Sequence, residues 1–81
     1  MAPFVTYILF SEKLDKYYIG STSNLERRLD EHNRGKTTFT KTGIPWKLMH
    51  YEEFNTKSEA LKRELEIKKR KSRIYIEKLF S

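Results

Sequence analysis

Residues 4–20 read FVTYILFSEKLDKYYIG, and this stretch decides the fold. Residues 4–10 are apolar or β-branched almost without interruption, a pattern typical of a strand that is covered on both faces and lies centrally in a sheet. The polar residues 11–16 predict a hairpin loop, and residues 17–20 predict a second short strand that ends at Gly20. We therefore expect the two strands to pair antiparallel.

Capping signals mark the helices that follow the hairpin. Ser23 and Glu26 form a Ser-x-x-Glu capping box, which predicts the start of a helix that ends near Gly35. Thr56 and Glu59 form a second capping box and predict the start of another helix. Over residues 72–81, strand propensity competes with an apolar helical face that Ser72 could cap, and we expect a helix there.

A loop and a third strand lie between these helices. Residues 35–45 are polar and carry no period, which predicts a loop that is long for so small a domain. Within residues 46–54, Trp46, Leu48 and His50 alternate with their neighbours, which predicts a strand with these three side chains on one face. The element order is ββαβαα, which predicts an α+β domain with helices packed on a small sheet.

Length and composition bound the class of protein. The chain has 81 residues and no cysteine, so residues 1–81 should fold as a single domain without disulfides or thiolate-bound metal. The sequence shows neither a signal peptide nor an apolar run of the roughly 18 residues that a membrane span needs. We expect a soluble, cytoplasmic protein with no membrane partner.

Positive charge is concentrated in the second half of the chain. The net charge is +6, and residues 41–81 carry eleven basic and six acidic side chains, against six and five in residues 1–40. The densest run consists of Lys68, Lys69, Arg70, Lys71 and Arg73. Such a run attracts nucleic acid through counterion release, but it is equally typical of a solvated helix end.

One acidic residue lies on a helical face where burial is expected. At about 100° per residue, Ala60, Leu61, Leu65 and Ile67 share one arc, and Glu64 falls near its middle. A buried carboxylate is unfavourable unless a cation, a metal ion or hydrogen-bond donors meet it. Glu64 is therefore either a metal ligand or the partner of a nearby lysine or arginine.

The helix after the hairpin carries two adjacent arginines, and only one of them can face the sheet. Leu25 and Leu29 define its apolar side, so Arg28 lies at the edge of that side and Arg27 lies almost opposite. The helical wheel thus selects Arg28 as the arginine that faces the sheet. Packing at the rim of the core is one role for such an arginine.

Several of these segments together resemble the GIY-YIG nuclease family. The matching segments are residues 5–9, 18–22, 24–33 and 60–68, the last with the pattern Ala-x-x-x-Glu-x-x-Ile-Lys. The resemblance covers about residues 4–79 and is closest to short, single-domain bacterial members, although Val5 and Thr6 replace the Gly and Ile of the first motif. It implies a three-stranded antiparallel sheet flanked by helices, and a metal-dependent endonuclease that hydrolyses phosphodiester bonds in DNA.

The resemblance also implies roles for individual residues. Glu64 would hold a divalent cation, Mg²⁺ or Mn²⁺, and Arg28 would stabilise the phosphoryl transition state. Tyr7 or Tyr18 would position or deprotonate the attacking water, although a phenol needs a nearby cation to act as a base and core packing is the alternative role. His32 would bind phosphate or relay protons, unless it only caps or packs the helix. Gly20 would allow a neighbouring group to approach the backbone closely where the second strand leaves the sheet.

Two functions therefore remain open from the sequence. One is the endonuclease, and the other is a non-catalytic nucleic-acid-binding module that keeps the fold and the basic run. The joint presence of Tyr7, Tyr18, Arg28 and Glu64 favours the enzyme, because binding to a phosphate backbone has no use for a buried acid. Since the chain has no room for a second domain, a partner protein or a homodimer could select the substrate.

Overall fold

The sheet is built around the strand that the sequence places at its centre. In the computed structural model, which describes residues 3–38 and 40–81, the strands are β1 (Phe4–Ser11), β2 (Lys16–Thr22) and β3 (Trp46–Phe54). Both outer strands pair antiparallel with β1, in the order β2-β1-β3. The prediction of an α+β fold with a three-stranded antiparallel sheet is confirmed.

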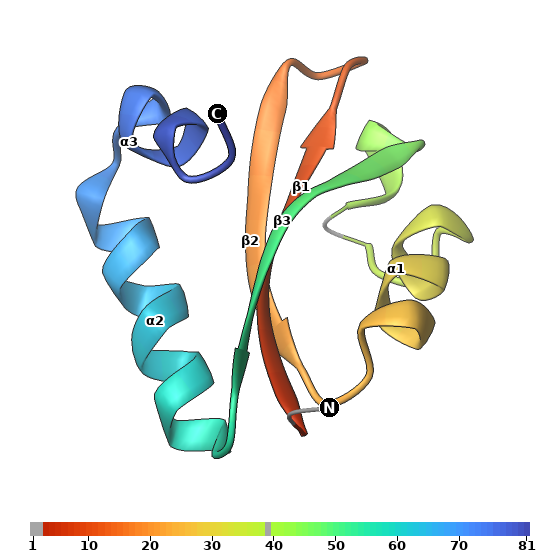
Figure 1. The fold of residues 1–81 in the computed structure, drawn as a ribbon. Helices are drawn as coiled ribbons and strands as arrows, with labels where there is room; N and C mark the ends of the chain where they lie inside the picture. The colour runs from red at the N-terminus through yellow and green to blue at the C-terminus, as the bar shows by residue number, and fades with distance from the viewer. Residues whose placement is uncertain (1–2, 39) are drawn as a thin grey trace.

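Helices cover both faces of this sheet. Helix α1 (Leu25–Asn33) lies on one side, and α2 (Lys57–Arg70) and α3 (Arg73–Lys78) lie on the other (Figure 1). A short 3-10 helix, η1 (Lys41–Gly43), interrupts the segment that the sequence predicts to be loop. The order ββαβαα is otherwise as expected. Among the described residues, no helix has the length and apolar character needed to cross a bilayer.

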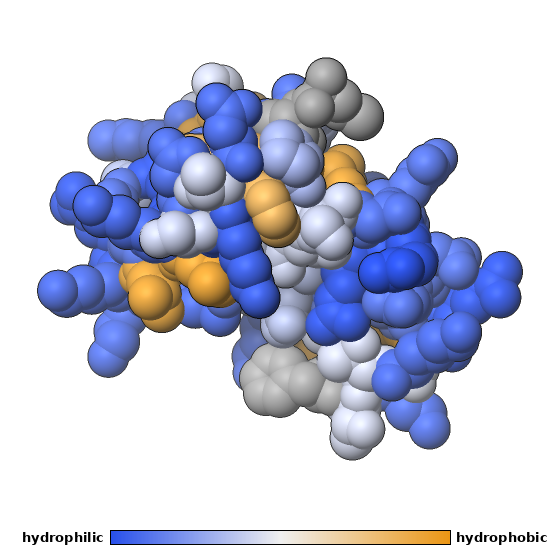
Figure 2. All heavy atoms as spheres, turned by 90° about the horizontal axis from the view of Figure 1, so that it is seen from below, coloured by the Kyte–Doolittle hydropathy of each residue, from blue (hydrophilic) through white to orange (hydrophobic). Residues whose placement is uncertain are grey.

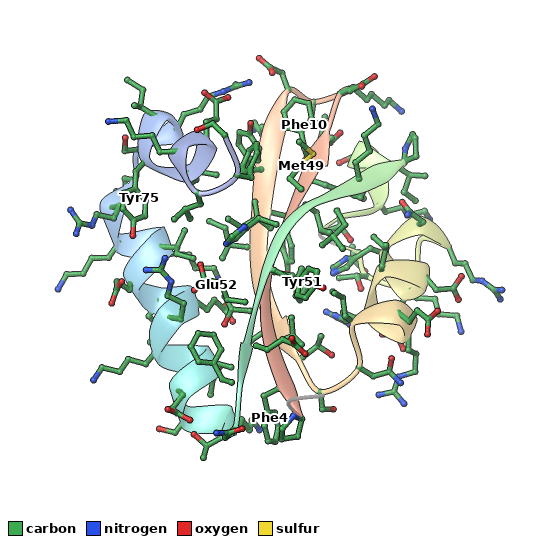
Figure 3. The ribbon with its side chains drawn as sticks, in the orientation of Figure 1. Phe4, Phe10, Met49, Tyr51, Glu52 and Tyr75 are labelled. Atoms are coloured by element: carbon green, nitrogen blue, oxygen red, sulfur yellow. The ribbon has the colours of Figure 1, made fainter. Side chains whose placement is uncertain are left out.

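Strand β1 separates two small apolar cores, because successive side chains of a strand point to opposite faces. On the α1 face the buried cluster consists of Val5, Tyr7, Leu9 and Trp46. On the α2 face it consists of Ile8, Ile19, Ile67 and Ile76. The neighbours Tyr51 and Glu52 on β3 show the same alternation, since Tyr51 points toward α1 and Glu52 toward α2 (Figure 3).

The passage from β2 to α1 differs from the prediction in two details. Strand β2 continues past Gly20 to Thr22, because it stays paired with β1 as far as Val5. The N-cap of α1 is Asn24 rather than Ser23, and its side-chain oxygen accepts a hydrogen bond from the backbone N–H of Arg27 at 3.0 Å. Asparagine caps helices as well as serine does. The backbone N–H of Asn24 donates to the Thr22 hydroxyl at 3.1 Å.

A β-bulge corrects the predicted pattern of β3. Leu9 lies opposite Leu48, but Ile8 lies opposite His50, so one extra residue enters β3 between the two pairs. A bulge of this kind reverses the face of every later side chain. The prediction that His50 shares a face with Trp46 and Leu48 is therefore wrong. His50 lies on the α2 face and contacts Glu52 at 2.8 Å.

Helix α2 is rotated relative to the predicted apolar arc. Ala60, Glu64 and Ile67 form the inward row at positions i, i+4 and i+7, whereas Leu65 is 64% exposed and Leu61 is also exposed. The inward position of Glu64 is confirmed, but the two leucines do not flank it in the core. The Thr6 hydroxyl donates to the Ala60 carbonyl at 2.7 Å and so fixes the first turns of α2 to β1.

The predicted caps of the last two helices are present. Thr56 and Glu59 form the reciprocal capping box of α2, and the Ser72 side chain accepts from the backbone N–H of Tyr75 at the start of α3. Arg63 joins three elements, since it pairs with Glu52 of β3 and donates to the Tyr75 hydroxyl at 3.1 Å. These contacts hold the C-terminal helices against the sheet.

Candidate active site

Three of the predicted site residues form one cluster on the α1 face. Tyr7 of β1, Tyr18 of β2 and His32 of α1 lie together, and we call them the phenol-imidazole cluster. The Tyr7 hydroxyl is 3.1 Å from Nε2 of His32, and the Tyr18 ring meets the imidazole edge-on with 4.9 Å between ring centroids. Strand pairing brings the tyrosines together, and α1 packs its last turn over them.

Arg28 approaches this cluster from one helical turn before His32. Its guanidinium pairs with Glu31 at 3.2 Å, and hydrogen bonding to Tyr7, to Glu31 and to Tyr18 raises the pKa of Arg28 against the opposing effect of burial. The side chain is about one-third exposed, so it faces both the phenols and solvent. The helical face therefore selects Arg28 over Arg27, as predicted.

Burial determines the protonation state of the cluster. It raises the pKa of Tyr7 to about 12, with a further contribution from Tyr18 and Glu64 that the Arg28 hydrogen bond opposes. Burial also lowers the pKa of His32, and the charge of Arg28 lowers it further. At neutral pH the resting cluster thus holds a protonated phenol beside a neutral imidazole.

Gly20 makes room for the Tyr7 ring. The two residues are directly paired across β1 and β2, and a Cβ at position 20 would lie 2.5 Å from the Tyr7 hydroxyl oxygen and 2.7 Å from Cζ. The contact is sterically forbidden for any other residue unless the ring moves. The absence of a side chain at Gly20 therefore lets the Tyr7 ring lie directly over the backbone of β2.

Glu64 lies on the opposite face of the sheet, beside the same strand. Its Oε1 accepts a hydrogen bond from the Ser21 hydroxyl at 2.7 Å, and its Oε2 accepts from Nζ of Lys68 at 2.5 Å. The side chain is 15% exposed. Because Gly20 and Ser21 are consecutive residues of the outer strand β2, the Tyr7 phenol and the Glu64 carboxylate lie on opposite sides of this strand, and the charge of Glu64 raises the pKa of Tyr7.

A hollow of about 370 Å³ opens beside this edge of the sheet. Its lining includes Arg28 and Ser21 together with two further cations, Arg27 and Lys57. Arg27 thus reaches the same hollow, although the helical wheel predicts that it points away. The end of the molecule at which β1 begins is mostly hydrophilic on its surface, with hydrophobic side chains confined to small patches (Figure 2).

The structure divides the predicted basic run. Lys68 pairs with Glu64, Arg70 lies over the Tyr75 ring at 4.9 Å, and Arg73 pairs with Asp15 at 2.8 Å. Lys69 and Lys71 are exposed and have no ion pair with any residue that the structure describes. Their role in binding nucleic acid stays a prediction, as does that of the whole run.

Several residues of this region carry no prediction from the sequence. Ser21 could have been found from strand alternation, since it follows Gly20 and must point to the Glu64 face. Lys57 is the first residue of α2, and it lines the hollow because the turn between β3 and α2 places it there. Thr40 is fully buried with its hydroxyl 2.7 Å from Nδ1 of His32, a contact that no local pattern announces.

Comparisons with known proteins identify the family of this chain. The sequence matches the GIY-YIG catalytic domain over residues 3–78. The chain belongs to the GIY-YIG family. It is 47% identical over 66 residues to a UPF0213 protein of Syntrophus aciditrophicus, with 78% of this chain and 76% of the relative covered.

Other relatives have similar length. A UPF0213 protein of Staphylococcus haemolyticus is 45% identical, with 84% of this chain and 83% of the relative covered. A UPF0213 protein of Haloquadratum walsbyi is 44% identical, with 76% and 72% covered. No solved structure matches this chain significantly. Membership in the GIY-YIG family supports a nuclease-type function with nucleic acid as the substrate class.

Proposed function

We propose that this GIY-YIG domain is a metal-dependent endonuclease that hydrolyses phosphodiester bonds in DNA. The observation that supports it most is that two phenols and a guanidinium cluster on the α1 face of the sheet, while a carboxylate is held by Ser21 on the other side of the adjacent strand β2. Phosphoryl transfer needs such a combination, because charge must be stabilised on the phosphate while a water molecule is oriented for attack.

Glu64 is the proposed ligand of a divalent cation. No group of three or more histidine, aspartate or glutamate side chains suited to metal occurs among the described residues, which disfavours an all-protein cage. Mg²⁺ and Mn²⁺ fit a single carboxylate, because Mg²⁺ keeps several waters and takes other oxygens from substrate phosphate. When bound, the ion would neutralise phosphate charge and stabilise the leaving oxygen. Lys68 would have to release Oε2 of Glu64.

Arg28 is the proposed phosphate-binding residue. Its partly exposed guanidinium lines the hollow, where Arg27 and Lys57 add positive charge along the path of a nucleic-acid backbone. A planar guanidinium can donate two parallel hydrogen bonds to phosphate oxygens, and their strength grows as negative charge develops in the transition state. Hydrogen bonding to the Tyr7 and Tyr18 phenols favours the charged guanidinium and raises the pKa of Arg28.

Tyr7 and His32 are the proposed proton carriers. A pKa of about 12 leaves almost no phenolate at neutral pH, so Tyr7 cannot accept the proton of water unless it gives up its own. His32 lies 3.1 Å from the Tyr7 hydroxyl and is neutral, because burial lowers its pKa. Tyr7 would take the proton from water while His32 takes the phenolic proton. Tyr18 would orient Arg28 and the water.

Cleavage assays with matched variants test this proposal. The wild-type protein, Glu64→Gln and Arg28→Ala are incubated with Mg²⁺ or Mn²⁺ and single-stranded, duplex and branched DNA. Each substitution should lower the cleavage rate about 100- to 1,000-fold, since each removes a group that stabilises transition-state charge. Arg34→Ala and Glu66→Gln are the controls and should keep the rate within about tenfold, because both alter exposed side chains that do not line the hollow.

Other outcomes of the assay lead to different conclusions. Equal residual cleavage by all variants would indicate a contaminating nuclease and contradict the proposal. Salt-sensitive binding without cleavage would instead support the nucleic-acid-binding module, for which exposed Lys69 and Lys71 provide charge. Cleavage that appears only at high protein concentration, or after a partner protein is added, would assign substrate selection to a homodimer or to that partner.

A further inference from the structure

A continuous set of hydrogen bonds leads from the phenol-imidazole cluster into the loop after α1. The Tyr7 hydroxyl contacts Nε2 of His32 at 3.1 Å, and Nδ1 of His32 contacts the Thr40 hydroxyl at 2.7 Å. The Thr40 hydroxyl in turn donates to the backbone carbonyl of Thr37 at 3.4 Å. Tyr7, His32 and Thr40 are all at least 99% buried, so solvent does not take part in these bonds.

The two ends of this set favour one direction for its hydrogens. A backbone carbonyl can only accept, so the Thr40 hydroxyl directs its hydrogen to Thr37 and must accept from Nδ1 of His32. At the other end, the Tyr7 hydroxyl lies 3.1 Å from Nε2 of His32, and the positive charge of Arg28 disfavours a Tyr7 hydrogen directed toward the guanidinium. Both conditions place the N–H of His32 on Nδ1 and leave Nε2 as the acceptor of the Tyr7 hydrogen.

We propose that Thr40 is a positioning residue for the nuclease reaction, which fixes the tautomer of His32 and thereby the direction in which Tyr7 passes on its proton. This inference rests on the proposed endonuclease function. Thr40 is fully buried and contacts Nδ1 of His32, the ring nitrogen that does not face Tyr7, so it acts through the imidazole and not on the substrate. It gives the loop at residues 36–45 a role in catalysis.

The loop holds the Thr40 hydroxyl against the imidazole through backbone contacts. The Thr40 N–H donates to the Thr37 carbonyl at 3.1 Å, and the Thr40 carbonyl accepts from the Trp46 indole at 2.7 Å and from the Gly43 N–H at 3.1 Å. Trp46 is itself fixed by Asn33, whose side chain accepts from its N–H at 2.6 Å and donates to its carbonyl at 3.1 Å. Trp46, which follows the loop, is thus tied to Asn33, the residue directly after His32.

The proton balance shows why the tautomer matters. As water attacks phosphorus, its O–H bond breaks and its proton moves to the Tyr7 oxygen, while the Tyr7 proton moves to Nε2 of His32. The ester P–O bond breaks with its electron pair on the leaving oxygen, which takes a proton from solvent. The imidazolium keeps its Nδ1–H on the Thr40 hydroxyl and later returns its Nε2 proton to solvent through Tyr7. In the other tautomer Nε2 already carries a hydrogen, so the Tyr7 proton has no acceptor.

Histidine ¹⁵N NMR of the full-length protein, without substrate, tests the hydrogen-bond arrangement directly. Wild type should show a neutral His32 with its hydrogen on Nδ1, and His50→Gln assigns the signals because the chain has only two histidines. Thr40→Val keeps the shape of the side chain but removes the acceptor, so the Nδ1–H preference should be lost. Thr40→Ser keeps the hydroxyl and should restore it. A wild-type His32 with its hydrogen on Nε2 would overturn the inference.

Steady-state cleavage by the same variants tests the catalytic role. Thr40→Val should lower kcat at least about tenfold with little change in KM, and Thr40→Ser should recover most of the rate. If Thr40→Val changes the tautomer but keeps the wild-type kcat, the positioning role is overturned and the endonuclease proposal stands. If folded wild type cleaves none of the DNA substrates, the endonuclease proposal fails, and the catalytic role of Thr40 fails with it.

Discussion

The two faces of the sheet are built from different chemistry. On the α1 face, the interior includes the Tyr7 phenol and the Thr40 hydroxyl, each hydrogen-bonded to the His32 imidazole. On the α2 face, the interior is an aliphatic cluster of Ile8, Ile19, Ile67 and Ile76, and the charged groups stay at its margin. The α1 face depends on the geometry of its polar groups, whereas the α2 face depends on filled volume.

This difference separates activity from stability within a small domain. A buried polar group is tolerated only while each partner is in place, and no buried side-chain nitrogen or oxygen lacks a partner among the described residues. An aliphatic cluster contributes mainly through the area it removes from water. Substitutions on the α1 face should therefore reduce activity first, and substitutions on the α2 face should reduce stability first.

Gly20→Ala adds a single methyl group and should nevertheless reduce activity strongly. The added methyl would lie 2.5 Å from the Tyr7 hydroxyl oxygen, so the ring must shift away from Arg28 and His32. We expect kcat to fall at least about 100-fold, because a displacement near 1 Å in an active site has effects of that size. Overpacking should also lower the free energy of unfolding by about 1–3 kcal/mol.

A double-mutant cycle provides the control for this prediction. In a Tyr7→Ala background the ring is absent, so adding the Gly20 methyl should change the free energy of unfolding little, and the coupling between the two sites should exceed about 1 kcal/mol. Additive effects would show that Gly20 matters for some reason other than the Tyr7 ring.

Ile67→Ala and Leu65→Ala compare a buried and an exposed position of the same helix. Ile67 is fully buried, and its truncation should lower the free energy of unfolding by about 2–5 kcal/mol. Leu65 is mostly exposed, and its truncation should stay within about 0.5 kcal/mol. Urea denaturation measures both, with kcat determined on the folded fraction, which should change little. Equal losses of stability would contradict the observed rotation of α2.

Alkaline titration gives a smaller effect that reports on Tyr7 alone. Its pKa is raised from 10.0 to about 12 in the folded protein, so its contribution to stability is complete below pH 10 and is lost as the pH rises toward 12. At about 1.4 kcal/mol per unit, wild type should lose about 2 kcal/mol relative to Tyr7→Phe by pH 12. Parallel denaturation series of the two proteins measure the difference, and parallel curves would show that Tyr7 titrates normally.

Much of the fold is readable from the sequence because its signals are local. The apolar run of β1, the Thr56 capping box and the Ser72 cap each act within a few residues, and each appears where it is expected. The β3 bulge escapes prediction because the extra residue is visible only once β1 is placed beside it. The exposure of Leu65 depends likewise on how α2 is rotated against the sheet, which a helical wheel does not specify.

The site was predictable in part for the same reason. Strand alternation and helical spacing give the inward positions of Arg28 and Glu64, and a resemblance between motifs gives them roles that remain to be tested. Contacts between distant segments were not accessible, such as that between Ser21 and Glu64. Thr40 is the clearest example of a residue that the sequence does not reveal. Its loop has no periodicity, and its contact is a hydrogen bond to His32, eight residues earlier in helix α1.

The β-bulge also bears on the solubility of the molecule. A three-stranded sheet leaves two outer strands whose free backbone groups could pair with another chain and start aggregation. Strand β3 is irregular at the bulge and carries Lys47 and Glu53, features that discourage a flat, regular partner strand. Strand β2 lies beside the charged side chains of Arg28 and Glu64, which discourage pairing with another chain at that edge as well.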